Sequence, residues 1–202
     1  MNFPKTAGQC KYMLALRSSK PIIIGTGPAG TGKTMLACNI ATEHILKHPR
    51  ARVVLTRPIV AADEDMGYLP GDMDQKMEPW TRPMYDIFEQ SMTHNQMDRC
   101  ISIEPLGYMR GRTFHHTLII ADEMQNSTPN QMKLLLTRIG EGTKIIVTGD
   151  LEQSDLEGDN GLENLVYKMQ CTELDYIQHV EMGDDDIVRH PAVKEVLGIL
   201  SK

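Results

Sequence analysis

The segment at residues 27–34 constrains the fold of this chain more than any other part of it. It reads Gly27, Pro28, Ala29, Gly30, Thr31, Gly32, Lys33 and Thr34. This sequence matches the pattern G-x-x-x-x-G-K-[ST] in full. An apolar run at residues 21–26 precedes it, and apolar residues at helical spacing follow it. A strand, a glycine-rich turn and a helix in this order predict a phosphate-binding loop (P-loop) rather than an ordinary turn.

The chemistry of such a loop gives its residues separate roles. Glycines let backbone N–H groups turn toward phosphate oxygens, and the N-terminus of the helix adds partial positive charge. We expect Lys33 to reach the β- and γ-phosphates of ATP, and the Thr34 hydroxyl to bind Mg²⁺. The sequence therefore predicts ATP and Mg²⁺ as cofactors.

A pair of acids follows the apolar run at residues 117–121. Asp122 ends this expected strand and is the second predicted ligand of the metal. Glu123 is placed to orient or deprotonate an attacking water. Acids after a strand often serve only as helix N-terminal charge. Here Thr128 already supplies the cap of the next helix, which favours the catalytic interpretation.

Residues 148–153 follow the next apolar run and read TGDLEQ. In an open parallel sheet the ligand binds beyond the carboxyl ends of the strands, so this loop should face the γ-phosphate. Gln153 is then a candidate sensor or water-positioning residue. Gly149-Asp150 alone would also fit an ordinary turn.

Strand-like and helix-like patterns alternate along the whole chain. Strands are expected at residues 21–26, 52–56, 100–104, 117–121, 144–148 and 176–180. Helices are expected at residues 34–46, 84–92, 128–139 and 162–169 and after Pro191. The segment 63–97 is rich in proline and methionine and is expected to be largely irregular. The alternation predicts one α/β domain over residues 1–202, with a mainly parallel sheet covered on both faces.

Composition limits the environment and the partners of the chain. No apolar run approaches the roughly 20 residues of a membrane span, and the first residues lack a secretory signal, so we expect a cytoplasmic location. The four cysteines are scattered, which argues against structural zinc and disulfides. The net charge of -6 opposes non-specific binding of nucleic acid, although a local arginine cluster can act within an acidic protein.

One such cluster lies at residues 108–112. Tyr108 can stack on a base while Arg110 and Arg112 contact phosphates, and Arg57 after the second strand can join them. This pattern predicts binding of RNA or single-stranded DNA. A packed tyrosine with screened surface charges is equally consistent with the sequence.

Several longer segments resemble the PhoH family of P-loop ATPases, which are similar to the first motor domain of superfamily 1 helicases. These segments are GPAGTGKT, TRP at 56–58, LPGD at 69–72, PLGYMRGRTF at 105–114, ADEMQN at 121–126, QMKLLLTRIG at 131–140, TGDLEQSDL at 148–156 and VRHP at 188–191. The resemblance implies a RecA-like P-loop NTPase fold, a three-layer sandwich, with ATP hydrolysis coupled to RNA.

The resemblance also extends to single positions. Gln9 and Tyr12 match the family's adenine-recognition segment. Gly8 stands where the family often has asparagine, and Met124 stands where its acidic motif, DEAQN, has alanine.

An arginine commonly stabilises the charge that develops on a transferred phosphoryl group. Arg189 and Arg138 are the candidates, and the resemblance favours Arg189. Either could instead be an ordinary surface arginine. One motor-type domain rarely completes its own site, so we expect a homo-oligomeric ring, such as a hexamer, with an arginine donated between subunits.

Three functions are consistent with these features. The first is an ATPase that acts on RNA or single-stranded DNA. The second is an ATP-gated switch or assembly module with slow turnover. The third is a small-molecule kinase, which is disfavoured because Asp122, Glu123 and Gln153 suit an attacking water.

Overall fold

The computed structural model describes residues 4–48, 50–58, 73–156 and 158–189, with the backbone alone for residues 73–80, and also Ala192, Val193, Val196 and Ile199. The first part of the expected insertion, residues 63–72, lies outside the described residues. This part includes the LPGD segment at 69–72. Most of the helix expected after Pro191 lies outside the described residues as well.

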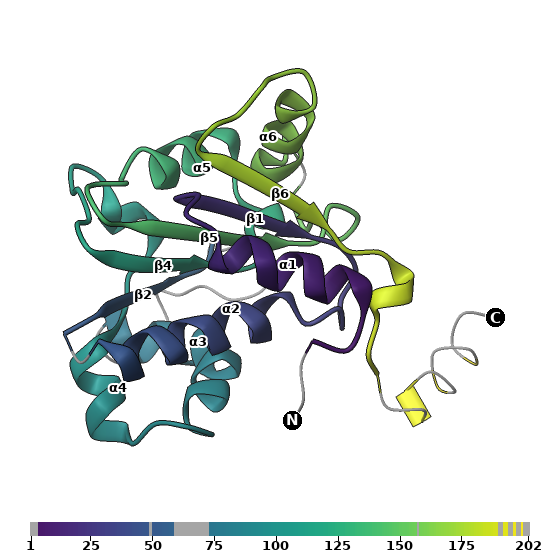
Figure 1. Ribbon diagram of the computed structural model, residues 1–202. Coiled ribbons are helices and arrows are strands. Elements are labelled where there is room, and N and C mark those ends of the chain that lie inside the picture. The colour runs from purple at the N-terminus through teal and green to yellow at the C-terminus, as the bar shows by residue number, and fades with distance from the viewer. Residues whose placement is uncertain are drawn as a thin grey trace.

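The strands form one sheet in which every described pairing is parallel (Figure 1). The strand order in this six-stranded sheet is β3-β2-β4-β5-β1-β6. The strands are β1 Ile22–Thr26, β2 Arg52–Thr56, β3 Ile101–Ile103, β4 Thr117–Ala121, β5 Lys144–Gly149 and β6 Ile177–Glu181. β1 and β4 are buried along their whole length, which explains why they read as continuous apolar runs and not as alternating ones.

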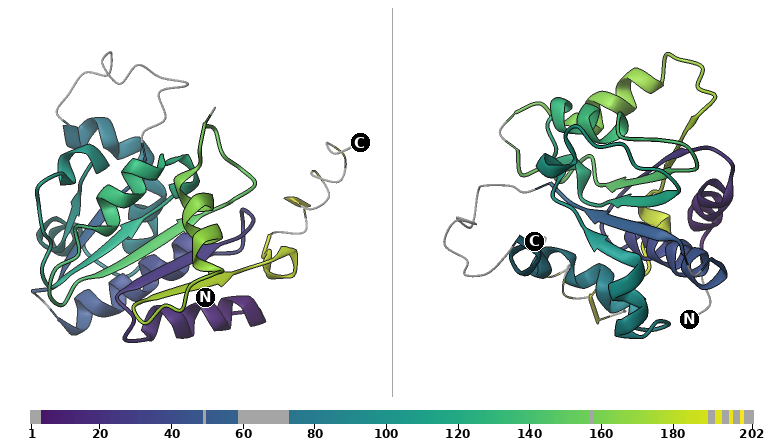
Figure 2. Two further views of the ribbon diagram at one scale, coloured as in Figure 1. Left: turned by 90° about the horizontal axis from the view of Figure 1, so that it is seen from above. Right: turned by 90° about the vertical axis from the view of Figure 1, so that its left-hand side faces the viewer.

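Helices cover both faces of the sheet (Figures 1 and 2). One layer contains α1 Ala7–Arg17, α2 Lys33–Lys47, α3 Met73–Phe88 and α4 His94–Cys100. The other contains the short 3-10 helices η1 Leu106–Met109 and η2 Met124–Asn126, with α5 Pro129–Leu136 and α6 Gly161–Met169. Neighbouring residues of a strand pack on opposite faces of the sheet. Val53 belongs to the hydrophobic core under the first helical layer, and Val54 belongs to the core under the second. The predicted three-layer α/β architecture is confirmed.

Strand register brings the carboxyl ends of the central strands together. Thr26 of β1 pairs with Gly149 of β5, and Ala121 of β4 pairs with Val147 of β5 and with Thr56 of β2. The loops that follow these strands therefore emerge at one edge of the sheet, where a ligand of an open α/β fold binds.

The insertion differs from its sequence prediction. It is helical from Met73, and α3 ends at Phe88 instead of residue 92. Proline at positions 79 and 83 argued against a helix. Met84 and Phe88 lie one turn apart and are buried in the core of the first layer, and this burial outweighs the cost of the prolines.

Other boundaries shift as well. The strand expected at 100–104 is shorter, because α4 extends through Cys100 after a capping box formed by Thr93 and Gln96. α1 was missed, although Thr6 accepts a hydrogen bond from Gln9 N as its N-cap. The capping box of Thr128 and Gln131 is confirmed at α5, but α5 ends at Leu136 and not at residue 139.

None of the helices that the structure describes is long and apolar enough to span a bilayer. Cys38 lies fully buried in α2, as expected of a small hydrophobic side chain. The described residues contain no cluster of three or more metal-binding side chains of the His, Cys, Asp or Glu type.

Candidate nucleotide site

The glycine-rich loop joins β1 to α2, as predicted. Gly27, Gly30 and Gly32 have φ angles of 139°, 89° and 86°, which side chains rarely tolerate. The Lys33 amine lies inside this loop and donates to the carbonyl oxygens of Gly27 and Pro28, at 2.5 and 2.9 Å. Only 9% of Lys33 is exposed.

Burial lowers the pKa of the Lys33 amine, and the carboxylates of Asp150, Glu123 and Asp122 oppose this shift. The lysine therefore has negative charges on the side of the loop where the strands end. It needs an anionic partner once it leaves the carbonyl groups of its own loop.

Asp122 follows β4, as predicted, and the structure places it beside Thr34. Thr34 Oγ1 donates to Asp122 Oδ1 at 2.8 Å, and the hydroxyl of Thr148 at the end of β5 donates to the same oxygen. Asp122 is buried. A hydroxyl and a carboxylate in contact are oxygen donors of the kind that Mg²⁺ prefers.

Glu123 comes next and has an unusual backbone. Its φ of 54° and ψ of 38° lie in the left-handed region, which few residues other than glycine adopt. Glu123 is half-buried, and its Oε2 accepts a hydrogen bond from Gln125 Nε2 at 2.5 Å. Asp122 and Glu123 thus occupy the edge of the sheet at which the phosphate loop begins.

The sequence prediction assigned a role in the site neither to Gln125 nor to Asp150. Both are buried, and Asp150 N donates to Gln125 Oε1 at 3.1 Å. Gln153, the predicted sensor, has an exposed side chain, and its backbone N–H donates to Asp150 O. The available signal was that Gln125 matches the glutamine of the family's acidic motif, DEAQN.

Gln9 links α1 to the phosphate loop. Its Nε2 donates to Thr31 O at 3.0 Å, and its Oε1 accepts from Lys5 N at 2.8 Å. Gln9 and Tyr12 are both fully buried. Tyr12 packs against Gly25 of β1 as part of the core of the first layer. Contact of either side chain with an adenine ring stays a prediction.

The segment 182–189 after β6 crosses both α1 and the phosphate loop, and we call it the strap. It contains the short helix η3 Asp184–Asp186. Asp186 Oδ1 accepts from Gly8 N at 2.9 Å, and Val188 N donates to Gly30 O at 3.0 Å. A Cβ at position 8 would overlap the Asp186 carboxylate, which explains glycine where the family often has asparagine.

Arg189 ends the strap and lies on the loop of its own chain. Its Nη2 donates to Ala29 O at 2.7 Å. A Cβ at Gly30 would come within 2.7 Å of Arg189 Nε. Arg138, the other predicted arginine, donates to the carbonyl oxygens of Leu134 and Arg112 at the end of α5.

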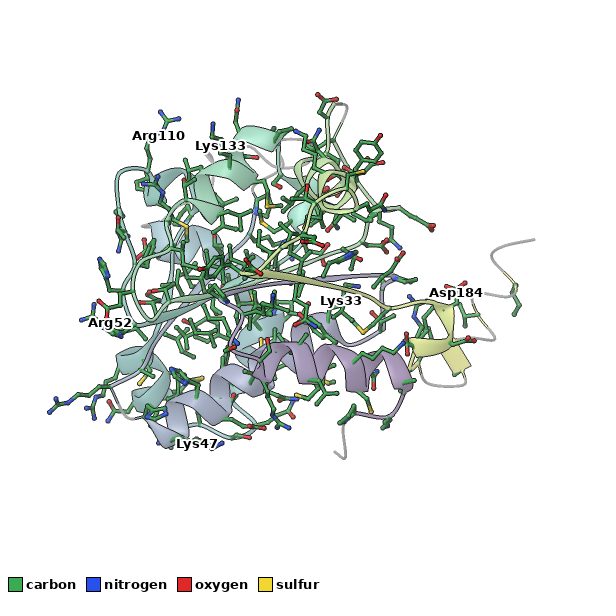
Figure 3. The ribbon with its side chains drawn as sticks, turned by 45° about the horizontal axis from the view of Figure 1, so that its top comes forward. Lys33, Lys47, Arg52, Arg110, Lys133 and Asp184 are labelled. Atoms are coloured by element: carbon green, nitrogen blue, oxygen red, sulfur yellow. The ribbon has the colours of Figure 1, made fainter. Side chains whose placement is uncertain are left out.

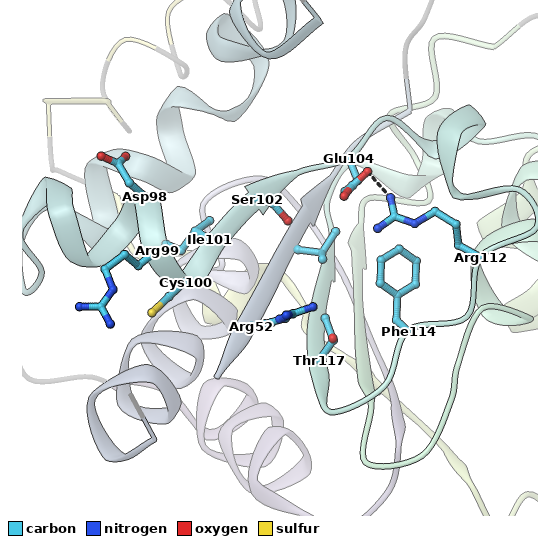
Figure 4. A pocket seen from close by; sticks show the side chains of 11 residues that line it. Arg52, Asp98, Arg99, Cys100, Ile101, Ser102, Glu104, Arg112, Phe114 and Thr117 are labelled. Atoms are coloured by element: carbon cyan, nitrogen blue, oxygen red, sulfur yellow. Dashed lines mark hydrogen bonds and ion pairs between the residues drawn. The ribbon is translucent and has the colours of Figure 1, made fainter. Parts of the chain in front are cut away.

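The residues predicted to bind nucleic acid fall into two groups. Arg112 donates to Glu104 Oε2 at 2.6 Å and lies 4.7 Å from the centre of the Phe114 ring. Arg112, Glu104 and Phe114 line one side of a hollow of about 350 Å³ along β2 and β3 (Figure 4). None of the described residues that line this hollow belongs to the phosphate loop. Arg57 is half-buried after β2.

Tyr108 and Arg110 instead face solvent. Tyr108 is 62% exposed on η1, and Arg110 has no ion pair with any described residue. Figure 3 shows Arg110 on the same side of the sheet as Lys133 of α5, whereas Lys47 of α2 lies on the opposite side.

The fold is shared with solved structures. The large terminase of a thermophilic bacteriophage has a TM-score of 0.59 at 14% identity, over 99% of this chain and 51% of the terminase chain. The Pif1 helicase of Candida albicans has a TM-score of 0.50 at 17% identity, over 100% of this chain and 44% of the helicase chain. The predicted RecA-like P-loop NTPase fold is confirmed.

Relatives at higher identity bear family names. A PhoH-like protein of Bacillus subtilis is 42% identical over 98% of this chain and 63% of the relative. Protein PhoH of Escherichia coli is 38% identical over 96% of this chain and 56% of the relative. The chain thus spans about three fifths of the length of these curated relatives, and its organisation as a single domain stays a prediction.

A family model described as PhoH-like protein matches residues 3–201. Together with the identities above, this match shows that the chain belongs to the PhoH family.

Proposed function

We propose that this chain binds ATP with Mg²⁺ and hydrolyses it. The observation that carries the proposal is the convergence of Lys33, the Thr34–Asp122 contact and Glu123 at one edge of the sheet. Mg²⁺ held by Thr34 and Asp122 would neutralise charge on the phosphates. Membership of the PhoH family and the P-loop fold support the same proposal.

Other residues of the chain bind the phosphates and act on the attacking water. The N–H groups of the loop and the Lys33 amine bind phosphate oxygens, and the lysine exchanges the carbonyl groups of Gly27 and Pro28 for them. Glu123 orients the attacking water and accepts its proton. Arg189 lies close enough to the loop to contact the same nucleotide.

We further propose that hydrolysis is coupled to RNA or single-stranded DNA. Exposed Tyr108 offers a ring for base stacking, and Arg110, two residues later, offers a charge for a phosphate. The likeness of the fold to a helicase is consistent with this coupling.

Phosphate release from ATP and Mg²⁺, with and without single-stranded RNA, tests the coupling. We expect RNA to stimulate the wild type, and Arg110→Ala to lose most of this stimulation while keeping its basal rate. Lys47→Ala is the matched control, because it removes one charge from an exposed side chain of the opposite layer and should leave stimulation intact.

Stimulation that survives Arg110→Ala unchanged would contradict the proposed surface. Tight ATP binding with background turnover, whether or not RNA is present, would favour the ATP-gated switch over the coupled ATPase.

A further inference from the structure

The amide of Gln125 bridges the loop after β4 and the loop after β5. Its nitrogen donates to Glu123 Oε2 at 2.5 Å, and its oxygen accepts from Asp150 N at 3.1 Å. A backbone N–H can only donate, so the atom that faces Asp150 has to be the oxygen. The amide nitrogen must then face Glu123, and the direction of this hydrogen bond is fixed.

Packing leaves the Gln125 side chain little freedom. It is 2% exposed. The absence of a side chain at Gly149 makes room for it, since a Cβ there would come within 2.8 Å of Gln125 Oε1. Ser154 Oγ donates to Gln125 O at 3.0 Å and holds the backbone as well. The donor that meets Glu123 is therefore fixed in position.

Glu123 is constrained at its backbone and at its carboxylate. The left-handed backbone, which is strained for a residue with a side chain, sets the direction in which the side chain leaves the chain. The hydrogen bond from Gln125 then restrains the carboxylate at the end of that side chain. Strain that surrounding contacts maintain is common at functional sites.

We infer that Gln125 is a positioning residue that holds the Glu123 carboxylate in place for the attacking water. The inference rests on the proposed function, in which Glu123 acts on that water. A carboxylate that can rotate away spends less time within hydrogen-bond reach of the water, so loss of this restraint lowers turnover. Gln125 itself acts only through Glu123.

Gln125→Glu tests the inference with almost no change of shape. The new carboxylate still accepts from Asp150 N, but it replaces the donor to Glu123 with a negative charge and repels that side chain. We expect kcat to fall at least about tenfold. The affinity for ADP should change little, because the hydrogen bonds of Gln125 run to Glu123, Asp150 and Ser154 and not to the phosphate loop.

Asn126→Asp is the matched control. Asn126 Nδ2 donates to Asp155 Oδ2 at 2.9 Å, and its Oδ1 accepts from Asp155 N at 2.9 Å. The substitution creates the same kind of repulsion between two carboxylates, here with Asp155, and changes no side-chain contact of Glu123. We expect a comparable loss in the urea midpoint of unfolding and a kcat close to that of the wild type.

The double variant Glu123→Gln with Gln125→Glu exchanges the two partners and restores a donor and an acceptor. In the nucleotide-free protein its urea midpoint should recover most of the loss caused by Gln125→Glu, while turnover stays absent. Failure of the midpoint to recover would overturn the inference, as would wild-type kcat in Gln125→Glu or an equal loss of kcat in Asn126→Asp. A wild type without turnover would contradict the proposed function, whereas the midpoints still test the contact by themselves.

Discussion

Tyr12 places a hydroxyl group in the core of the first layer. The side chain is fully buried, and its oxygen has no hydrogen-bond partner among the described residues. Burial raises the pKa of this hydroxyl well above its ordinary value, so the group stays neutral. A buried polar atom without a partner lowers stability.

We expect Tyr12→Phe to leave the free energy of unfolding unchanged or to raise it by about 1 kcal/mol. Urea denaturation measures this difference. The affinity for ADP should not change if Tyr12 serves only the core. A clear loss of ADP affinity would show instead that the hydroxyl reaches the nucleotide, as the family resemblance implies.

The strap binds the backbone of α1 and of the phosphate loop, and the Asp186 carboxylate makes its contact with α1. Burial acts to raise the pKa of Asp186. Hydrogen bonds from Thr6, Gly183 and Gly8, with the charge of Lys11, outweigh this effect and hold the pKa below its ordinary value. The ionised carboxylate therefore stabilises the folded chain.

We expect Asp186→Asn to lower the free energy of unfolding by about 1–2 kcal/mol at neutral pH. Since the folded pKa is depressed, this contribution is present above the ordinary aspartate value and is lost as pH falls through the folded pKa. Denaturation at pH 7 and in acid should show the gap between wild type and variant closing in acid. A gap that persists there would mean that the charge of Asp186 is not its source.

The strands and the acids that end them could be predicted because local pattern determines them. An apolar run followed by Asp122 and Glu123 is sufficient when the strands are parallel. Contacts between distant segments could not be predicted in this way. Asp186 lies far along the chain from Gly8, and Gln125 meets Asp150 only once β4 and β5 are paired.

The prediction of helix boundaries failed for a similar reason. The prolines at 79 and 83 gave a local signal against α3, and burial of Met84 and Phe88 in the core overrode it. α1 is a weakly patterned helix, and the only local signal for its start is its N-cap, Thr6, which by itself is too common to predict a helix.

The position of Arg189 bears on how copies of this chain assemble into a ring. Its guanidinium contacts the loop of its own chain, so donation of this arginine to a neighbouring subunit would require the strap to leave that loop. A ring can still form with Arg189 serving its own nucleotide. We expect light scattering with ATP and Mg²⁺ to show an oligomer, and a monomer at every concentration would contradict the expected ring.

We propose that the edge of the sheet built by Lys33, Asp122 and Glu123 hydrolyses ATP. The most direct test measures phosphate release and ATP binding side by side in the wild type and in Glu123→Gln. The glutamine keeps an acceptor for Gln125 Nε2, so the fold of the loop should persist. We predict that the variant binds ATP as tightly as the wild type and that its turnover falls at least about a hundredfold. Equal turnover in the two proteins would contradict the proposed role of Glu123 in hydrolysis.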